Sequence, residues 1–292
     1  MVGVDMPTSS DPQNNANAAG TFPLGGVTPV VRLGYGAMRI TGPGIMGEPT
    51  DADEARRVLT RAVELGVTFI DTAHAYGPLV SERLIGETLA PYADDLVIAT
   101  KGGLHRDSRG SWLADGSPAT LLAELQQSLV LLRVGTVDLY QLHTVDRRVP
   151  IAESVGALAQ LQREGLIKMI GLSNVSLDDL RAAQAEAEIV SIQNRFSVGD
   201  DGPLVDVCAR EGLAFIPYFP LRAGAVERER QLRDVASRLG ATPFQVALAW
   251  LLKRSPNMLP IPGTSSVAHL EENLAAASVE LPEPDLVELG GD

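Results

Sequence analysis

The stretch "PTDADEARRVLTRAVELGVTFIDTAHAYG" (Pro49–Gly77) combines a helix pattern, a strand pattern and a polar strand end. Apolar residues recur at helical spacing over residues 51–65, with Thr50 or Asp51 as N-cap and Gly66 after the last turn. The run at 67–71 is short and mostly apolar, as in strands that are buried on both faces. It stops on Asp71, and Tyr76 follows. The stretch therefore predicts an α/β unit that carries polar groups beyond a buried strand.

The same unit recurs along the 292 residues. The patterns predict strands at roughly 32–37, 67–71, 95–100, 136–142, 168–172, 189–193, 213–217 and 258–261. They predict helices at roughly 51–65, 81–90, 118–132, 151–164, 176–187, 202–211, 242–253 and 267–276. Eight alternating units predict an α/β fold of the (β/α)8 TIM barrel type, with a doubly wound open sheet as the alternative. We also expect an N-terminal β-hairpin before the first strand and an extra helix after strand seven, at roughly 227–239.

Composition excludes several classes of protein. Residues 1–20 are rich in Ser, Asn, Pro, Asp and Gly and lack a basic region followed by an apolar core, so we expect a disordered tail, with the barrel over 21–292. No apolar run approaches the roughly 20 residues that cross a bilayer. The net charge of −13 argues against nucleic acid as a partner. The single cysteine, Cys208, fits a reducing cytosol as a buried, inert thiol. We expect a cytoplasmic monomer or small homo-oligomer.

Polar residues follow the predicted strands, where (β/α)8 barrels carry their chemistry. These residues are Asp71, Lys101, His143, Ser173, Asn174, Gln193 and Tyr218. With Tyr76, the first three form a candidate proton-transfer site. The ammonium of Lys101 would lower the pKa of the Tyr76 phenol, and Asp71 would keep Lys101 charged. His143 could then hydrogen-bond a carbonyl oxygen and orient it toward the phenol.

The motifs "GVTFIDTAHAYG", "LVIATKGG", "VDLYQLH", "GLIKMIGLSN" and "IPGTSS…EEN" together resemble the aldo-keto reductases over about residues 22–290. The catalytic Asp, Tyr, Lys and His of that family match Asp71, Tyr76, Lys101 and His143. The resemblance implies an oxidoreductase that acts on a small carbonyl compound. A hydride would pass from a reduced nicotinamide to the carbonyl carbon while Tyr76 protonates the oxygen.

The resemblance also implies a cofactor site. Ser173, Asn174 and Gln193 would bind the nicotinamide carboxamide, and Tyr218 would stack on the ring. The remaining expected cofactor contacts are Phe219, Pro220 and Leu221 at the pyrophosphate, Gly263, Thr264, Ser265, Ser266 and His269 at the adenosine phosphate, and Glu272 and Asn273 at the adenine. Many members that use NADPH carry Lys and Arg where this chain has Gly263 and His269. We expect NADP(H), bound by hydroxyls and backbone N–H groups, with NAD(H) as the alternative.

The loops after strands one, three and seven are expected to select the substrate. The candidate pocket residues are Met38, Met46, His105 and Trp112, together with Phe219. "LGYGAMRITGPGIMGEP" and "WLLKRSPNMLPIPGTSSVAHLEEN" resemble bacterial pyridoxal-reductase-like members most, which suggests pyridoxal or another aromatic aldehyde.

Other functions are weighed against this one. The four histidines include no close pair with metal-ligand spacing, so no metal site is expected. A nucleotide-binding regulatory or sensor protein resembling the potassium-channel β-subunits is the main alternative. A barrel enzyme that uses Lys101 as a Schiff-base nucleophile would leave the nicotinamide-type site unused.

Overall fold

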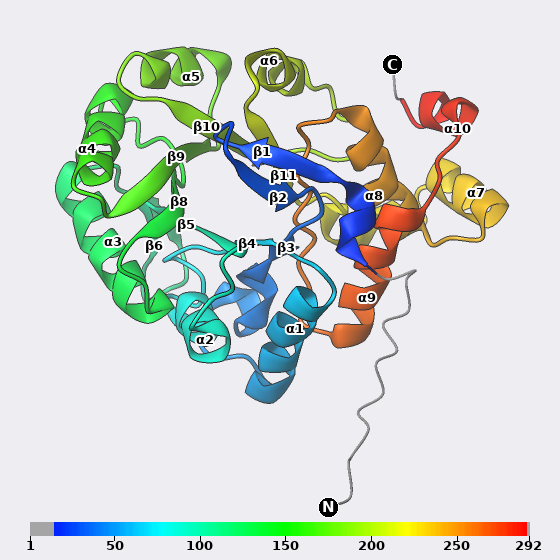
Figure 1. Cartoon of the computed structure of the whole chain (residues 1–292), viewed down its shortest axis with the longest axis horizontal. Coiled ribbons are helices and arrows are strands. Elements are labelled where there is room, and N and C mark those ends of the chain that lie inside the picture. Colours follow the sequence, from blue (N-terminus) through cyan, green and yellow to red (C-terminus); the bar gives the residue numbers. More distant parts are fainter. Residues whose placement is uncertain (1–14, 291–292) are drawn as a thin grey trace, which may run out of the picture.

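The computed structural model describes residues 15–290, apart from the side chains of residues 222 and 223. Seven parallel strands follow one another in the order in which they occur along the chain (Figure 1). These strands are β3 (Tyr35–Gly36), β4 (Phe69–Asp71), β5 (Val97–Gly102), β8 (Val137–Leu142), β9 (Ile167–Ser173), β10 (Ile189–Arg195) and β11 (Ala214–Tyr218). A doubly wound sheet reverses its strand order at a switch point. Because no reversal occurs here, that alternative is excluded.

The segment predicted as the eighth strand closes the barrel without forming a regular strand. On one side, the Phe215 N–H donates to the Asn257 carbonyl oxygen over 2.9 Å, and the Leu259 N–H donates to the Phe215 carbonyl oxygen over 2.8 Å. On the other side, the N–H groups of Gly34 and Gly36 donate to the carbonyl oxygens of Pro260 and Pro262 over 3.0 and 3.5 Å. The two prolines lack N–H groups, so a complete ladder cannot form. The predicted (β/α)8 barrel is confirmed, with an irregular extended segment in the place of the eighth strand.

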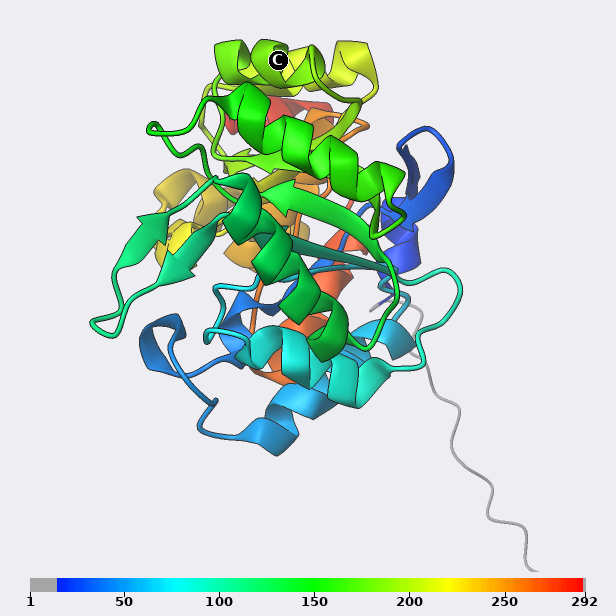
Figure 2. The ribbon, with the colours of Figure 1, turned by 90° about the vertical axis from the view of Figure 1, so that its left-hand side faces the viewer.

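The predicted N-terminal β-hairpin is present, and it covers the amino-terminal end of the barrel. Strand β1 (Thr21–Leu24) pairs antiparallel with β2 (Thr28–Val31). Phe22, Leu24 and Val30 of the hairpin share one buried cluster with barrel side chains that include Phe69, Val97, Leu139 and Met169. The opposite end of the barrel carries a hairpin that the sequence patterns did not predict, β6 (Leu104–Arg106) with β7 (Trp112–Ala114). Figure 2 shows the two hairpins on opposite sides of the barrel.

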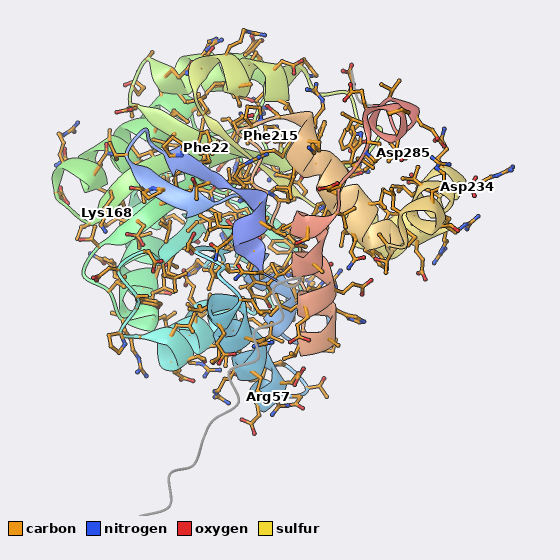
Figure 3. The ribbon with its side chains drawn as sticks, turned by 45° about the vertical axis from the view of Figure 1, so that its right-hand side comes forward. Phe22, Arg57, Lys168, Phe215, Asp234 and Asp285 are labelled. Carbon is orange, nitrogen blue, oxygen red and sulfur yellow. The ribbon has the colours of Figure 1, made fainter. Side chains whose placement is uncertain are left out.

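Helices surround the strands close to the predicted positions (Figure 1). They are α1 (Ala52–Glu64), α2 (Val80–Leu89), α3 (Pro118–Leu132), α4 (Ile151–Arg163), α5 (Leu177–Gln184), α6 (Pro203–Glu211), α7 (Arg230–Leu239), α8 (Pro243–Arg254), α9 (Val267–Ala275) and α10 (Glu283–Glu288). Helix α7 is the predicted extra helix, and α10 was not predicted. Asp51 caps α1 by accepting the N–H of Glu54, which decides between the two expected caps. Charged side chains such as Arg57, Lys168 and Asp234 project from the outer surface (Figure 3).

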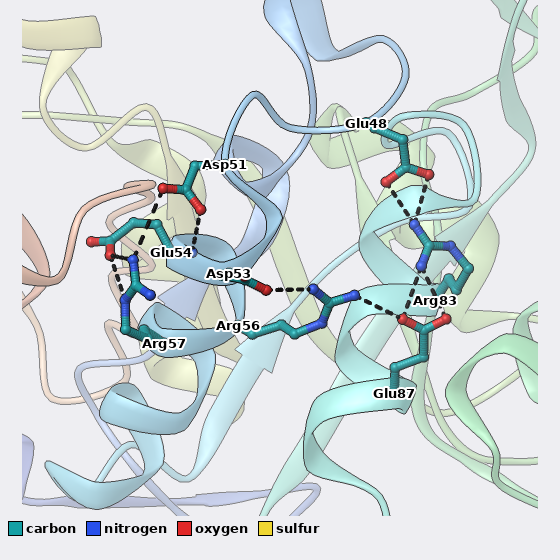
Figure 4. A network of polar contacts seen from close by, with 8 residues as sticks. All are labelled: Glu48, Asp51, Asp53, Glu54, Arg56, Arg57, Arg83 and Glu87. Atoms are coloured by element: carbon teal, nitrogen blue, oxygen red, sulfur yellow. Dashed lines mark hydrogen bonds and ion pairs between the residues drawn. The ribbon is translucent and has the colours of Figure 1, made fainter.

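A surface network of ion pairs joins α1, α2 and the loop before α1 (Figure 4). Arg56 contacts Asp53 over 3.1 Å and Glu87 over 3.4 Å. Arg83 contacts Glu87 over 2.9 Å and Glu48 over 2.7 Å. Exposed pairs of this kind contribute little to stability one by one. Their effect here is to hold the end of the loop that follows β3 against α2.

The N-terminal segment becomes ordered earlier than predicted. Residues 1–14 of the expected disordered tail lie outside the described residues. Ala16–Ala19 form a 3-10 helix, and the Ala16 N–H donates to the Leu65 carbonyl oxygen over 2.9 Å. Because Ala16 and Ala19 are buried, residues 15–20 belong to the folded part of the chain.

Two further expectations concern Cys208 and the membrane. Cys208 is fully buried in α6, and burial raises the pKa of its thiol to about 12. The thiol is therefore protonated and unreactive at neutral pH. Among residues 15–290, no helix has both the length and the apolar character that a membrane span requires.

Candidate active site

Side chains that point into the barrel change from apolar to polar at the carboxyl ends of the strands. Successive side chains of a strand point to opposite faces. On β5, Val97 and Ala99 lie in the interior cluster, and Lys101 follows on the same face. The resulting polar rim surrounds a cavity of about 570 Å³. Its lining includes the predicted residues Met38, Asp71, Tyr76, Trp112, His143, Ser173, Asn174, Gln193, Tyr218, Phe219, Pro220, Leu221 and Gly263.

Lys101 is held by all three of its N–H donors. Its Nζ donates to Asp71 Oδ1 over 2.6 Å, to the Thr72 carbonyl oxygen over 2.8 Å and to the Tyr76 hydroxyl oxygen over 3.3 Å. The side chain is completely buried. Burial opposes the ammonium charge, but the acidic groups of Asp71 and Tyr76 outweigh it and raise the pKa of Lys101 above its usual value. Lys101 is therefore a charged group with a fixed orientation.

Tyr76 is a neutral phenol at pH 7. Burial raises the pKa of Tyr76 above 10.0, and the charge of Lys101 opposes this shift without cancelling it. The predicted effect of Lys101 has the right direction, but the net shift is opposite to the one expected from the sequence. Because Lys101 donates to the phenol oxygen, the Tyr76 O–H remains available as a donor at the cavity wall.

Asp71 accepts hydrogen bonds on both carboxylate oxygens. Besides the bond from Lys101, its Oδ2 accepts from Gln141 Nε2 over 3.1 Å and from Gln193 Nε2 over 2.8 Å. Gln193 also donates to Gln141 Oε1 over 3.4 Å, so its two amide hydrogens are used inside the protein. Gln141 was missed in the sequence. It lies two residues before His143 and thus on the same strand face, which counting back along "YQLH" would have revealed.

His143 is an uncharged imidazole. Burial first and the nearby Lys101 charge second hold its pKa well below 6.5. Its Nδ1 is buried and has no partner among the described residues. Since an orphaned N–H is rarer than an orphaned acceptor, this favours the tautomer with the proton on Nε2. The ring meets Tyr76 edge-on, with centroids 5.8 Å apart.

The residues expected around a nicotinamide form a connected group. Asn174 has φ +57° and donates from Nδ2 to the His143 carbonyl oxygen over 3.0 Å and to Ser173 Oγ over 3.2 Å. The Tyr218 hydroxyl donates to Asn174 Oδ1 over 2.6 Å, which fixes the phenol ring beside the cavity. The Ser173 hydroxyl and the Gln193 Oε1 oxygen remain for a ligand. This set of a flat ring with hydrogen-bonding groups beside it fits a planar ring that carries an amide.

The expected phosphate loop is only partly at the cavity. Gly263 lines the cavity, whereas Ser265 lines a neighbouring cleft of about 330 Å³ that also contacts Arg39. Thr264 is buried, and its Oγ1 accepts the Ser266 N–H over 3.1 Å. His269, Glu272 and Asn273 lie on α9 and line neither space.

Glu54 of α1 is an unpredicted neighbour of this loop. Its Oε1 accepts the N–H of Val267, the first residue of α9, over 3.0 Å. That hydrogen bond first, and the bond from Arg57 second, lower the pKa of the Glu54 carboxyl, so it is ionised at neutral pH. Arg39 lines both spaces, and its guanidinium has no partner within residues 15–290. The contact between Glu54 and Val267 is not visible in the local sequence pattern.

Two of the expected substrate residues do not line the cavity. Met46 forms a bridge with Gly77 instead. His105 lies on β6 between Leu104 and Arg106, and because strand side chains alternate it is on the face opposite to Leu104. Lining residues that the sequence analysis missed include Gly36, Arg39, Ile45, Leu104, Phe244, Ile261 and Pro262.

The sequence model of the Aldo/keto reductase family matches residues 32–289. The chain belongs to this family. It is 46% identical over 282 residues to pyridoxine 4-dehydrogenase of Escherichia coli, across 94% of this chain and 98% of that protein. It is 43% identical over 277 residues to an uncharacterized oxidoreductase of Schizosaccharomyces pombe, across 94% and 90% of the two chains. A thermostable aldo-keto reductase in complex with the inhibitor epalrestat has 31% identity and a TM-score of 0.80, across 92% and 98% of the chains.

As an aldo/keto reductase, the chain is an oxidoreductase. Its site contains a neutral phenol and a neutral imidazole at the cavity wall, with a buried ammonium beside the phenol. Within the described part of the chain, no three His, Cys, Asp or Glu side chains are grouped as a metal ion would require. This arrangement can donate a proton to an oxygen atom and stabilise the negative charge left on the phenol.

Proposed function

We propose that the chain is an NADP(H)-dependent carbonyl reductase in which Tyr76 is the general acid. The observation that carries this proposal is the hydrogen bond from Lys101 Nζ to the Tyr76 oxygen, 3.3 Å long, in a site where Asp71 fixes the same ammonium. It links a proton donor to a positive charge that stabilises the donor after the proton has left.

The proposed reaction assigns one task to each of the four residues. His143 donates its N–H to the substrate carbonyl oxygen and aims that oxygen at Tyr76. A bound nicotinamide would supply the hydride that the carbonyl carbon receives. As the carbonyl π electrons move onto oxygen, Tyr76 transfers its proton to that oxygen and becomes a phenolate. Lys101 stabilises the phenolate, and Asp71 keeps Lys101 charged and in place.

The residues around the rest of the cavity support a dinucleotide as the hydride source. Ser173, Asn174 and Gln193 would bind the carboxamide, and the Tyr218 ring would stack on the nicotinamide. Phe219, Pro220 and Leu221 would cover the pyrophosphate, with the loop from Gly263 to Ser266 at the adenosine phosphate. His269, Glu272 and Asn273 are proposed to contact the adenosine from α9. We favour NADP(H) over NAD(H).

Pyridoxal or another aromatic aldehyde is the proposed substrate. The 46% identity to E. coli pyridoxine 4-dehydrogenase supports a pyridine carbinol or aldehyde. The apolar and aromatic lining of the cavity, which includes Met38, Trp112 and Phe219, supports any flat aromatic carbonyl compound of similar size.

The test is the variant Tyr76→Phe, assayed with NADPH, pyridoxal and 4-nitrobenzaldehyde. General acid catalysis is worth about 10²–10⁴-fold, so kcat should fall by at least about 100-fold while NADPH affinity, measured by fluorescence titration, stays unchanged. Tyr92→Phe is the matched control, because Tyr92 donates its hydroxyl to the Leu132 carbonyl oxygen, outside the cavity. Unchanged turnover in Tyr76→Phe would refute the proposed acid. Bound cofactor without turnover in the native chain would support the regulatory alternative.

A further inference from the structure

Two loops form one wall of the cavity, and Arg106 joins them. The loop after β3 contributes Ile45, which ends the 3-10 helix η4 (Pro43–Ile45), and the β6–β7 hairpin contributes Leu104 and Trp112. Arg106 is on β6, directly across from Trp112 on β7. Both loops lie on the side of the barrel opposite to the N-terminal hairpin (Figure 2).

The guanidinium of Arg106 binds both loops at once. Its Nε and Nη2 donate to the Gly110 carbonyl oxygen over 3.0 and 2.7 Å, within the hairpin. Its Nη1 donates to the Ile45 carbonyl oxygen, and Nη2 donates to the Gly44 carbonyl oxygen, each over 3.2 Å. Its Cζ lies 3.9 Å from the centroid of the Trp112 ring. Only a planar fork of donors can make these contacts and also stack on an indole.

Ile45 is in a conformation that needs such support. Its φ is +62°, in the left-handed region, which β-branched residues rarely adopt. Arg106 holds its carbonyl oxygen, and its N–H donates to the Gly42 carbonyl oxygen over 3.0 Å. The same loop is attached to the Tyr76 segment, because the Gly47 N–H donates to the Gly77 carbonyl oxygen over 2.6 Å. The loop is thus fixed between the proposed acid and the hairpin.

We propose that Arg106 is a specificity-determining residue that holds Ile45 and Trp112 as a rigid wall, and that this wall selects flat aromatic carbonyl substrates. The inference rests on the proposed function and identifies the residue that would give the same site its preference for aromatic substrates. Trp112 and Phe219 are each 42% exposed at the cavity, which leaves two aromatic surfaces for a planar ligand. The indole of Trp112 also meets His143 edge-on at 6.3 Å between centroids, so a ring against this wall lies beside the imidazole proposed to orient the carbonyl oxygen.

The test compares an aromatic aldehyde, which would contact the wall, with a small aliphatic aldehyde. The aliphatic aldehyde can reach Tyr76 and His143 without the aromatic surface of Trp112, so its turnover reports the proton-transfer site alone. Arg106→Gln removes the fork and the cation. We expect KM for 4-nitrobenzaldehyde to rise about tenfold, with kcat and KM for propanal changed less than about twofold. Arg106→Lys restores the charge without the planar fork and should recover little of the loss.

Arg109→Gln is the matched control, because Arg109 lies in the same hairpin turn and its side chain has no partner among the described residues. It should behave as the native chain. Acrylamide quenching of tryptophan fluorescence gives a second measurement that needs no turnover. The chain has two tryptophans, and Trp250 is buried, so quenching reports Trp112. Arg106→Gln should increase quenching, and Arg109→Gln should not.

Two results would overturn the inference. One is an equal change in KM for the aromatic and the aliphatic aldehyde, and the other is unchanged quenching of Trp112 in Arg106→Gln. If the native chain reduces neither aldehyde, the proposed function fails, and increased quenching would then support only the role of Arg106 in holding the wall.

Discussion

The carboxylate of Glu54 accepts the N–H of Val267 over 3.0 Å, across 213 residues of sequence. This bond puts a negative charge at the start of α9, next to the loop that the sequence predicts to bind the adenosine phosphate. A helix N-terminus normally favours an anion, and here a side chain already occupies one of its N–H groups.

Glu54→Gln should therefore strengthen NADPH binding more than NADH binding. Glutamine keeps an oxygen for the Val267 N–H and removes the charge that repels the extra phosphate. We expect the affinity ratio of NADPH to NADH to rise several-fold in fluorescence titrations, with a smaller rise at high ionic strength. Glu64→Gln, an exposed carboxylate at the end of the same helix, is the control. An equal effect on both cofactors would contradict this expectation.

Reduction should show no histidine inflection in its pH profile. His143 has a pKa well below 6.5, so it stays neutral through the neutral range. Tyr76 must be protonated to act as the acid, and its pKa lies above 10.0. Thus kcat/KM for reduction should be level around neutral pH and fall only above pH 10.0. Alcohol oxidation needs the phenolate and should rise at alkaline pH, where the phenol loses its proton. An inflection near 6.5 that disappears in His143→Gln would contradict the assignment of a neutral imidazole.

Asp71→Asn should destabilise the fold as well as slow turnover. The Lys101 ammonium and the Asp71 carboxylate are 0% and 2% exposed, so the variant leaves a buried charge without its counter-charge. Breaking a buried pair in this way costs about 3–5 kcal/mol, which urea unfolding would measure. The double variant Asp71→Asn with Lys101→Met should recover much of that stability and none of the activity. If the double variant were less stable than Asp71→Asn, the ion pair would not be the cause.

Two helical glycines should respond oppositely to alanine. A Cβ on Gly86 in α2 would lie 2.0 Å from the Leu131 carbonyl oxygen of the neighbouring α3, whereas a Cβ on Gly156 in α4 would meet nothing within 4 Å. Overpacking costs about 1–3 kcal/mol or more, so Gly86→Ala should lower the free energy of unfolding by at least about 1 kcal/mol. Gly156→Ala should raise it by about 0.5–1 kcal/mol through helix propensity. Thermal unfolding of the two variants would distinguish these outcomes, and equal shifts would contradict the packing argument.

Asp146 should contribute to the stability of the fold at pH values above 3.8. Hydrogen bonds from Arg148 are the main cause that lowers the pKa of Asp146 from 3.8 to about 2. A depressed pKa means that this contribution is present above pH 3.8 and is lost as the pH falls through about 2. Asp146→Asn should therefore flatten the pH dependence of unfolding in that window. An unchanged slope would contradict the assignment.

The parts of the fold that depend on local pattern could be predicted from sequence. The strand that ends on Asp71 and the helix that begins at Pro118 follow from apolar spacing and caps, and both are where the patterns placed them. The β6–β7 hairpin was missed because its strands have three residues each and mix charged with apolar side chains. The irregularity of the eighth segment could have been predicted from Pro260 and Pro262, which have no N–H groups to donate to a strand ladder.

The candidate site also has a part that could be predicted from the sequence and a part that could not. Side chains at strand ends were found because the barrel gathers them at one rim. Contacts that join distant segments were not, such as Arg106 to Ile45 and Glu54 to Val267, because no local pattern records them. The net pKa shift of Tyr76 also needed the structure, since burial outweighs the Lys101 charge that the sequence had revealed.

Pro260 and Pro262, in the irregular eighth segment, have a consequence for the way a ligand would stabilise the barrel. Four backbone hydrogen bonds hold residues 257–262 between β11 and β3, and the prolines cannot add further donors. We call the contact of residues 257–262 with β11 and with residues 34–36 the seam of the barrel. Because few backbone hydrogen bonds must break for the barrel to open along this seam, its amides are expected to exchange early. Tyr218 and Gly263 line the cavity from the two sides of the seam. A dinucleotide that touches both would cross-link the seam, so its saturation should slow amide exchange there and raise the melting temperature.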